Sequence, residues 1–201
     1  MLPHSDLLQR KRWNTPTIYN GWEQITKGNP AADAFNLEET RDFMPQMGPM
    51  VGYAVTVVCE PGNAAHKKSN PRAAREYRRY VAAQPGPKIV VVQDLDRPRV
   101  IGSFWGEVNA NIHKALGSQG LLTNGSVRDI DEVRPLGFHF FASGLHVSHG
   151  YAHLEEFNRP VKVFGLLVHP GDLLHCDKHG AALIPKEIAE HVYARALEIE
   201  E

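Results

Sequence analysis

The residues best suited to chemistry lie in one stretch in the middle of the chain. Two glycine-bounded turns, in the segments 102–111 (GSFWGEVNAN) and 117–129 (GSQGLLTNGSVRD), each follow a strand-like run and lead into a helix-like run. Backbone N–H groups at such a helix start are free to bind a carboxylate or a phosphate. Arg128 adds a planar guanidinium for the same kind of anion, and Asp129 adds a hard oxygen ligand that suits magnesium or manganese.

An anion site, a fixed cation and a metal-binding carboxylate together suit a reaction that passes through an enolate. The metal and the arginine would stabilise the negative charge that develops on the substrate oxygen. The spacing alone leaves a plainer interpretation open. Adjacent Arg and Asp residues often form a surface ion pair worth less than about 1 kcal/mol, and glycines before helices often serve turn geometry alone.

Three histidines form a second candidate. His146, His149 and His153 would lie near one face of a helix, and imidazoles suit zinc or iron. Gly144 and Gly150 interrupt the segment and favour a loop instead. Packing and surface hydrogen bonding are commoner roles for histidine, although one of these side chains could line a substrate pocket as an acid or a base.

Other familiar enzyme motifs are missing from the sequence. It contains no Gly-x-Ser-x-Gly elbow of a serine hydrolase. The segment 117–120 (GSQG) is too short for a dinucleotide fingerprint, and no glycine-rich loop ends in Lys-Ser or Lys-Thr. Cys176 follows apolar strand residues, which indicates a buried structural thiol rather than a nucleophile.

The composition is that of an ordinary globular protein, with 42% hydrophobic and 22% charged residues. The 201 residues fit one domain, 1–201. The net charge of −1 predicts no nucleic acid and no membrane among the partners, and the Lys67-Lys68 and Arg78-Arg79 pairs are interpreted as solvated faces. No apolar run approaches the roughly 20 residues that span a bilayer. Two cysteines suit a reducing compartment, so we expect a cytoplasmic protein.

Helical and strand-like patterns alternate along the chain and predict an α/β fold. The first 45 residues are expected to be mostly helical, with helix starts at Thr15-Pro16 and at Asn36. Further helices are expected at 72–83, at 106–116 with Val108, Ile112, Ala115 and Leu116 at helical spacing, at 130–136, and from Pro185 to the C-terminus. Strands are expected at 52–59, 88–93, 121–124, 138–142 and 161–168, and a hairpin at 173–176 and 181–184.

The central stretch resembles a known family. The pattern Gly117-x-x-Gly120-Leu-Leu-x-Asn-Gly-Ser-Val-Arg128-Asp129 is similar to the core motif of the RraA-like family. That family includes the 4-hydroxy-4-methyl-2-oxoglutarate/4-carboxy-4-hydroxy-2-oxoadipate aldolases and the regulator of ribonuclease E activity A. The segments 160–173 (PVKVFGLLVHPGDL), 177–180 and 184–185, together with 15–17 and 52–56 upstream, also resemble family positions, so the likeness runs from Thr15 to the final helix.

The resemblance implies a compact, layered α/β domain with mixed sheets flanked by helices, assembled as a homotrimer or a hexamer with a site between subunits. It implies that Asp129 binds Mg²⁺ or Mn²⁺, that Arg128 contacts the substrate, and that the backbone of Gly106, Glu107, Val108 and Asn109 binds it. Glu107 stands where the family usually carries aspartate, and would hold metal-bound waters and relay a proton. A neighbour's C-terminal acidic residue would be Glu198, Glu200 or Glu201.

The activity that the resemblance implies is cleavage of a 4-hydroxy-2-oxo acid to pyruvate and a second carbonyl compound, with oxaloacetate decarboxylation as a side reaction. Two alternatives stay open, because a shared fold does not fix function. One is a regulator that binds a ribonuclease without catalysis, and the other is a different enzyme for a hydroxy acid or a sugar acid. A metal carboxylate beside an arginine favours the lyase over the regulator.

Overall fold

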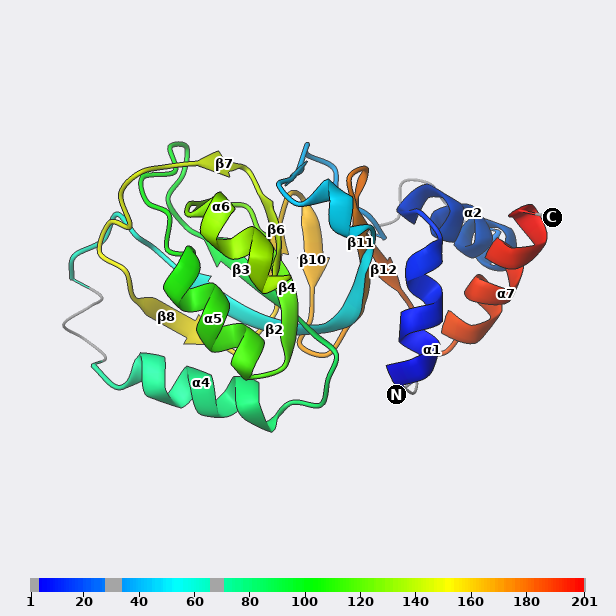
Figure 1. The fold of residues 1–201 in the computed structure, drawn as a ribbon, viewed down its shortest axis with the longest axis horizontal. Coiled ribbons are helices and arrows are strands. Elements are labelled where there is room, and N and C mark those ends of the chain that lie inside the picture. Colours follow the sequence, from blue (N-terminus) through cyan, green and yellow to red (C-terminus); the bar gives the residue numbers. More distant parts are fainter. Residues whose placement is uncertain (1–3, 28–33, 66–70, 201) are drawn as a thin grey trace.

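A mixed eight-stranded sheet forms the centre of the computed structural model, which describes residues 4–27, 34–65 and 71–200 (Figure 1). The strand order is β1-β6-β4-β3-β2-β11-β12, with β8 pairing to β2 as well. Strands β2, β3, β4 and β6 run parallel, while β1, β8, β11 and β12 pair antiparallel. Their bounds are β1 Arg41–Asp42, β2 Met50–Cys59, β3 Lys88–Asp94, β4 Ser118–Thr123, β6 His139–Ala142, β8 Leu154–Phe157, β11 Leu173–Asp177 and β12 Gly180–Ile184.

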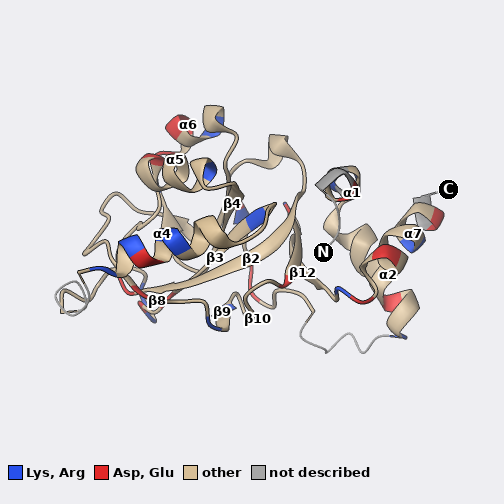
Figure 2. Cartoon of the chain, turned by 90° about the horizontal axis from the view of Figure 1, so that it is seen from below, with Lys and Arg blue, Asp and Glu red and all other residues tan. Residues whose placement is uncertain are grey.

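Each face of this sheet is covered by a different layer. Helices α4 (Ala73–Ala83), α5 (Glu107–Ala115) and α6 (Ile130–Val133) pack on one face. A hairpin of β9 (Val161–Val163) and β10 (Leu166–Val168) covers the other. Figure 2 shows the sheet from below, between α4 and α5 on one side and β9 and β10 on the other.

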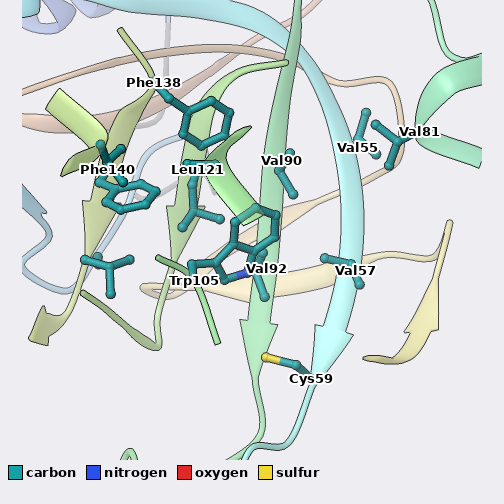
Figure 3. Close-up of a cluster of buried hydrophobic side chains, with 14 of the residues drawn as sticks. Val55, Val57, Cys59, Val81, Val90, Val92, Trp105, Leu121, Phe138 and Phe140 are labelled. Atoms are coloured by element: carbon teal, nitrogen blue, oxygen red, sulfur yellow. The ribbon is translucent and has the colours of Figure 1, made fainter. Parts of the chain in front are cut away.

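The central strands are buried on both faces, which explains their continuous apolar sequence. All ten residues of β2 are buried, and so are residues 88–92 of β3. Runs of valine and isoleucine are typical of parallel strands covered on both sides. Figure 3 shows Trp105 among Val90, Val92 and Leu121 in the cluster under the helices, where the tryptophan is 1% exposed.

A separate group of helices packs at one end of the sheet, near both termini (Figure 1). It consists of α1 (His4–Gln9), α2 (Thr15–Thr26) and α7 (Ala189–Glu200). Asn14 caps α2 by accepting a 2.9 Å hydrogen bond from the Thr17 N–H, so the predicted helix start at Thr15-Pro16 is confirmed. Leu7, Trp22 and Val192 from these helices are buried against β11 and β12.

Several element predictions are wrong, each for a local reason. Asn36 does not start a helix, because its side chain accepts a hydrogen bond from the Ala181 N–H and donates to the Glu38 carbonyl. Within 34–45 the chain forms bends, a bridge and β1, and 28–33 lie outside the described residues. The segment 161–168 is a hairpin rather than one strand, because the chain turns at Phe164-Gly165, both with positive φ.

The apolar face expected on α5 is also different. Ala110 and His113 are buried, whereas Val108 is 70% exposed.

The final helix begins at Ala189, after a turn at 186–188. Strand β8 and the short strands β5 (Ser126–Val127) and β7 (Gly144–Leu145) were not predicted. The expected α/β class with mixed sheets and flanking helices is confirmed. In the part of the chain that the structure describes, no helix has the length and apolarity needed to cross a bilayer.

Candidate active site

Asp129 lies on a turn that leads from the central sheet into α6. Strand β4 ends at Thr123, and β5 then carries the chain to Arg128 and Asp129. Asp129 adopts φ 57° and ψ 43°, a left-handed conformation that is uncommon for residues other than glycine. Its carbonyl oxygen accepts the first hydrogen bond of α6, from the Val133 N–H at 2.9 Å. A strained backbone at an exposed carboxylate is typical of a functional position.

The start of α5 is brought against Asp129 by backbone pairing. Trp105 forms a parallel bridge with Val127, and the Arg128 N–H donates to the Trp105 carbonyl at 3.0 Å. The next residue, Gly106, therefore faces Asp129. A Cβ at Gly106 would lie 2.3 Å from Asp129 Oδ2, so no larger residue fits without moving the carboxylate. The Glu107 N–H donates to the same oxygen at 3.0 Å.

Arg128 lies beside this carboxylate and is held on two sides. Its Nε is 3.6 Å from Asp129 Oδ2, and its Nη1 donates to the Val147 carbonyl at 3.1 Å. The Arg128 and Asp129 side chains are 36% and 35% exposed. They border a hollow of about 410 Å³ lined by Arg128, Asp129, Ile130, Asp131, Glu132, Leu145, His146 and Val147. The guanidinium is thus positioned while part of its surface faces the hollow.

The other predicted site residues are placed around this pair in different ways. Glu107 contributes its backbone N–H, while its side chain is exposed and does not line the hollow. The Val108 and Asn109 N–H groups lie in the first turn of α5, where they have no intrahelical acceptor. The Asn109 side chain turns inward and donates to the Phe104 carbonyl at 2.7 Å. The structure therefore brings Gly106 and the Glu107 backbone to Arg128 and Asp129, but not the Glu107 carboxylate.

A buried histidine anchors α5 from below. His113 is 1% exposed, and burial lowers its pKa to about 4, so the imidazole is neutral. Because the Asn109 carbonyl can only accept, His113 Nδ1 donates to it at 2.7 Å. Nε2 then accepts from the Tyr77 hydroxyl at 3.1 Å. This network joins α5 to α4 and fixes the helix whose first turn meets Asp129.

Asp94, which the sequence analysis missed, supports the turn before Arg128. Its N–H donates to Asn124 Oδ1 at 2.7 Å, and Asn124 Nδ2 donates to the Asp94 carbonyl at 3.1 Å. Burial raises the pKa of the Asp94 carboxyl to about 7. A Cβ at Gly125 would lie 2.5 Å from Asp94 Oδ2, so the carboxyl packs directly under the turn. Sequence reasoning could have found Asp94 because it directly follows the predicted strand 88–93, and ligand sites in parallel sheets lie at the carboxyl ends of the strands.

The three histidines do not form a metal centre. The segment 146–153 contains no helix, and only His146 among them lines the hollow. His149 and His153 make local contacts to the backbone oxygens of Gly150 and Tyr151. Within the described ranges, no three His, Cys, Asp or Glu side chains gather as metal ligands. The structure therefore contradicts the hypothesis of a zinc or iron site at these histidines.

The donor set at Asp129 fits a different kind of metal. One carboxylate is available there, in the space that Gly106 leaves by lacking a Cβ. Structural zinc sites need about four nitrogen or sulfur ligands. Magnesium is usually bound by one or two carboxylates and keeps several waters. Asp129 therefore suits magnesium or manganese. Of the predicted C-terminal acids, Glu198 pairs with Arg195 on the same helix, while the Glu200 side chain and Glu201 lie outside what the structure describes.

Comparison with known proteins identifies the family. The model of the RraA-like family, described as Aldolase/RraA, matches residues 28–183, which include the whole site. The chain belongs to the RraA-like family. The matched range contains Arg128 and Asp129.

Individual relatives are more distant. A Halalkalibacterium halodurans protein provisionally named a 4-hydroxy-4-methyl-2-oxoglutarate aldolase is 31% identical over 115 residues, covering 57% of this chain and 53% of that protein. Protein DlpA of Legionella pneumophila is 22% identical over 156 residues, covering 75% of this chain and 24% of that protein. The matched segments thus span between a quarter and a half of these relatives.

The fold has a solved counterpart in RraAS2 of Streptomyces coelicolor, described as an unusual member of the RNase ES inhibitor RraA protein family. The TM-score is 0.75 at 20% identity, with 99% of this chain and 93% of that chain covered. At this identity the likeness establishes the fold alone. The family therefore includes both aldolases and ribonuclease inhibitors.

Proposed function

We propose that this protein is a divalent-metal-dependent lyase that cleaves a 4-hydroxy-2-oxo acid to pyruvate and a second carbonyl compound. The observation that carries the proposal is the pairing of Asp129 and Arg128 at the edge of the hollow, with the start of α5 hydrogen-bonded to the Asp129 carboxylate. An isolated surface ion pair would need neither a glycine at position 106, where a Cβ would clash with the Asp129 carboxylate, nor the left-handed backbone at Asp129. The 31% identical relative named as an aldolase supports the same reaction class.

The 2-oxo acid end of the substrate would be bound by hydrogen-bond donors of the protein and by the metal ion on Asp129. Arg128 would bind the carboxylate of the 2-oxo acid through its free guanidinium N–H donors. The Val108 and Asn109 N–H groups at the start of α5 would add backbone donors and the positive end of the helix dipole. Asp129 would hold Mg²⁺ or Mn²⁺, which when bound supplies a Lewis acid for the ketone and its enolate.

Cleavage requires a base for the C4 hydroxyl and an acid for the enolate. The Glu107 carboxylate is exposed at the first turn of α5 and lies outside the hollow, so it would accept the C4 hydroxyl proton through an intervening water. C4 then becomes a carbonyl as the C3–C4 bond breaks, and the electron pair passes to the C2 oxygen. Arg128 stabilises this charge. Return of the proton to C3 gives pyruvate, and loss of carbon dioxide from oxaloacetate uses the same enolate.

The protein would act as a homotrimer or a hexamer. Val108, Leu145 and Val147 are 70%, 54% and 94% exposed beside the site. Exposed apolar side chains gathered in one region mark a contact surface. A second subunit at this surface would cover the hollow and exclude water from it. Size-exclusion chromatography with light scattering measures the assembly.

A substrate panel tests the proposal. Pyruvate release from several 4-hydroxy-2-oxo acids and oxaloacetate would be followed through lactate dehydrogenase, with and without a chelator. We expect turnover that the chelator removes and Mg²⁺ or Mn²⁺ restores. No release from any substrate would exclude the lyase and favour the ribonuclease regulator or another hydroxy-acid enzyme.

A further inference from the structure

Helix α4 carries a strongly basic outer face on the opposite side of the helix from its packed residues. Ala73, Tyr77 and Val81 are buried, one turn apart. Arg72, just before the helix, and Arg75, Arg78 and Arg79 within it are all exposed. At about 100° per residue these four arginines fall within an arc of about 120° centred away from the buried side. We call them the α4 arginine stripe; basic positions along α4 are visible in Figure 2.

Three arginines of the stripe, Arg75, Arg78 and Arg79, have little compensating charge. Glu76 is the one acidic residue of α4. In the described parts of the chain, no carboxylate forms an ion pair with Arg75, Arg78 or Arg79. The balance of 22 basic and 23 acidic residues in the whole chain therefore conceals a local excess of positive charge. Net charge alone does not indicate this local excess.

Folding does not account for this arrangement. Like charges three or four residues apart on a helix destabilise it by about 0.2–0.5 kcal/mol per pair, and Arg75 has such a relation to Arg72, Arg78 and Arg79. Cations in the first turn also oppose the helix dipole. Because α4 is held by its buried face, Arg75, Arg78 and Arg79 can serve a binding role.

We propose that the α4 arginine stripe binds the phosphate backbone of a nucleic acid without reading its bases. Guanidinium groups bind phosphates with paired hydrogen bonds, and such contacts give sequence-independent affinity. Base stacking has no partner here, since Tyr77 is buried and Tyr80 stacks on Phe157. An anionic membrane fits less well, because the outer face offers only alanines for insertion.

The stripe lies away from the candidate active site. α4 packs against β8, whereas the hollow is bordered by α6 and β7 (Figure 1). The two proposals are therefore independent. Charge changes on α4 should leave pyruvate release unchanged.

The test is fluorescence anisotropy with a labelled oligouridylate of about 20 nucleotides. We expect a dissociation constant of roughly 1–100 µM at 50 mM salt. Three phosphate contacts, from Arg75, Arg78 and Arg79, predict a slope of about −2 in log K against log salt, so affinity should fall roughly 20-fold between 50 and 200 mM salt. Arg75→Glu/Arg78→Glu/Arg79→Glu should weaken binding at least 30-fold while the circular dichroism spectrum is retained.

The matched control is Lys162→Glu/Lys178→Glu/Lys186→Glu, which makes the same change in total charge at exposed positions away from α4. We expect this variant to bind within about threefold of the wild type. No saturable binding at 50 mM salt, or equal losses in the two variants, would overturn the proposal. So would binding to phosphatidylserine vesicles in place of the oligonucleotide.

Discussion

Gly106→Ala is the perturbation that most sharply probes the contact between α5 and Asp129. The φ of Gly106 is −154°, so the backbone accepts alanine, and the effect arises from the new methyl group. The methyl would lie 2.3 Å from Asp129 Oδ2, about 1.1 Å inside the 3.4 Å of an ordinary contact, and 3.0 Å from Arg128 Cγ. The carboxylate must therefore move by about 1 Å, which also breaks its 3.0 Å hydrogen bond from the Glu107 N–H.

A displacement of that size in a catalytic constellation reduces the rate about 100-fold, which corresponds to about 2.7 kcal/mol of transition-state stabilisation. The cost to folding should be smaller, below about 1 kcal/mol, because both side chains are one-third exposed and can relax toward solvent. We expect kcat/KM for pyruvate release to fall about 100-fold and the melting temperature to stay within a few degrees.

Gly144→Ala is the matched control, since a Cβ there meets no atom within 4 Å although β7 pairs with β5 next to the site. We expect that variant to keep wild-type kinetics. If Gly106→Ala turned over at the wild-type rate, the close approach of Gly106 to Asp129 would have no catalytic consequence and the site would need to be reassigned.

Three further predictions concern single side chains. Arg128→Lys keeps the charge but loses the planar pair of donors, so kcat/KM should fall at least tenfold, and unchanged kinetics would indicate a mere surface ion pair. Asp94→Asn should gain stability relative to the wild type as pH rises from 4 to 7, because the pKa of the folded Asp94 carboxyl is raised to about 7 and ionisation then opposes folding. His113→Gln should gain stability relative to the wild type as pH falls from 6.5 to 4, because burial lowers the His113 pKa to about 4 and only the unfolded state takes up the proton in that range. Urea denaturation over this pH range measures both effects, which are at most about 4 kcal/mol for Asp94 and about 3 kcal/mol for His113. Differences that do not change with pH would contradict the assigned burial.

The central strands were predictable from sequence, and so was the choice of Arg128 and Asp129 as candidate site residues. Runs of valine and isoleucine in β2 and β3 have few alternatives to a buried strand. The motif around Arg128 and Asp129 lies within one continuous stretch, and helix α5 starts at Glu107, directly after Gly106, close to the start that its turn pattern indicates.

What could not be predicted depends on contacts between distant segments. The Phe164 carbonyl accepts hydrogen bonds from the Leu37 and Glu38 N–H groups, and this contact accompanies a turn at a phenylalanine with positive φ. Alternating apolar residues there resemble a single strand. The Val147 carbonyl that holds Arg128 comes from a loop without a pattern of its own.

The charge distribution was likewise invisible in the total. The arginines of the predicted helix 72–83 were expected on a solvated face, and the burial of Ala73, Tyr77 and Val81 confirms it. By contrast, Val108 was expected on the packed face of α5 but lies outside it. Periodicity identified these helices, and packing decided which of their faces was buried.

Comparing wild type and Asp129→Asn for pyruvate release, across a titration of Mg²⁺, tests the central claim most directly. Asparagine preserves the shape of the side chain and removes its charge, so the fold and the neighbouring Arg128 are disturbed least. We expect metal-dependent turnover in the wild type and a loss of at least 100-fold in the variant, which added metal does not restore. Equal, metal-responsive turnover in both proteins would contradict the assignment of Asp129 as the metal-binding carboxylate.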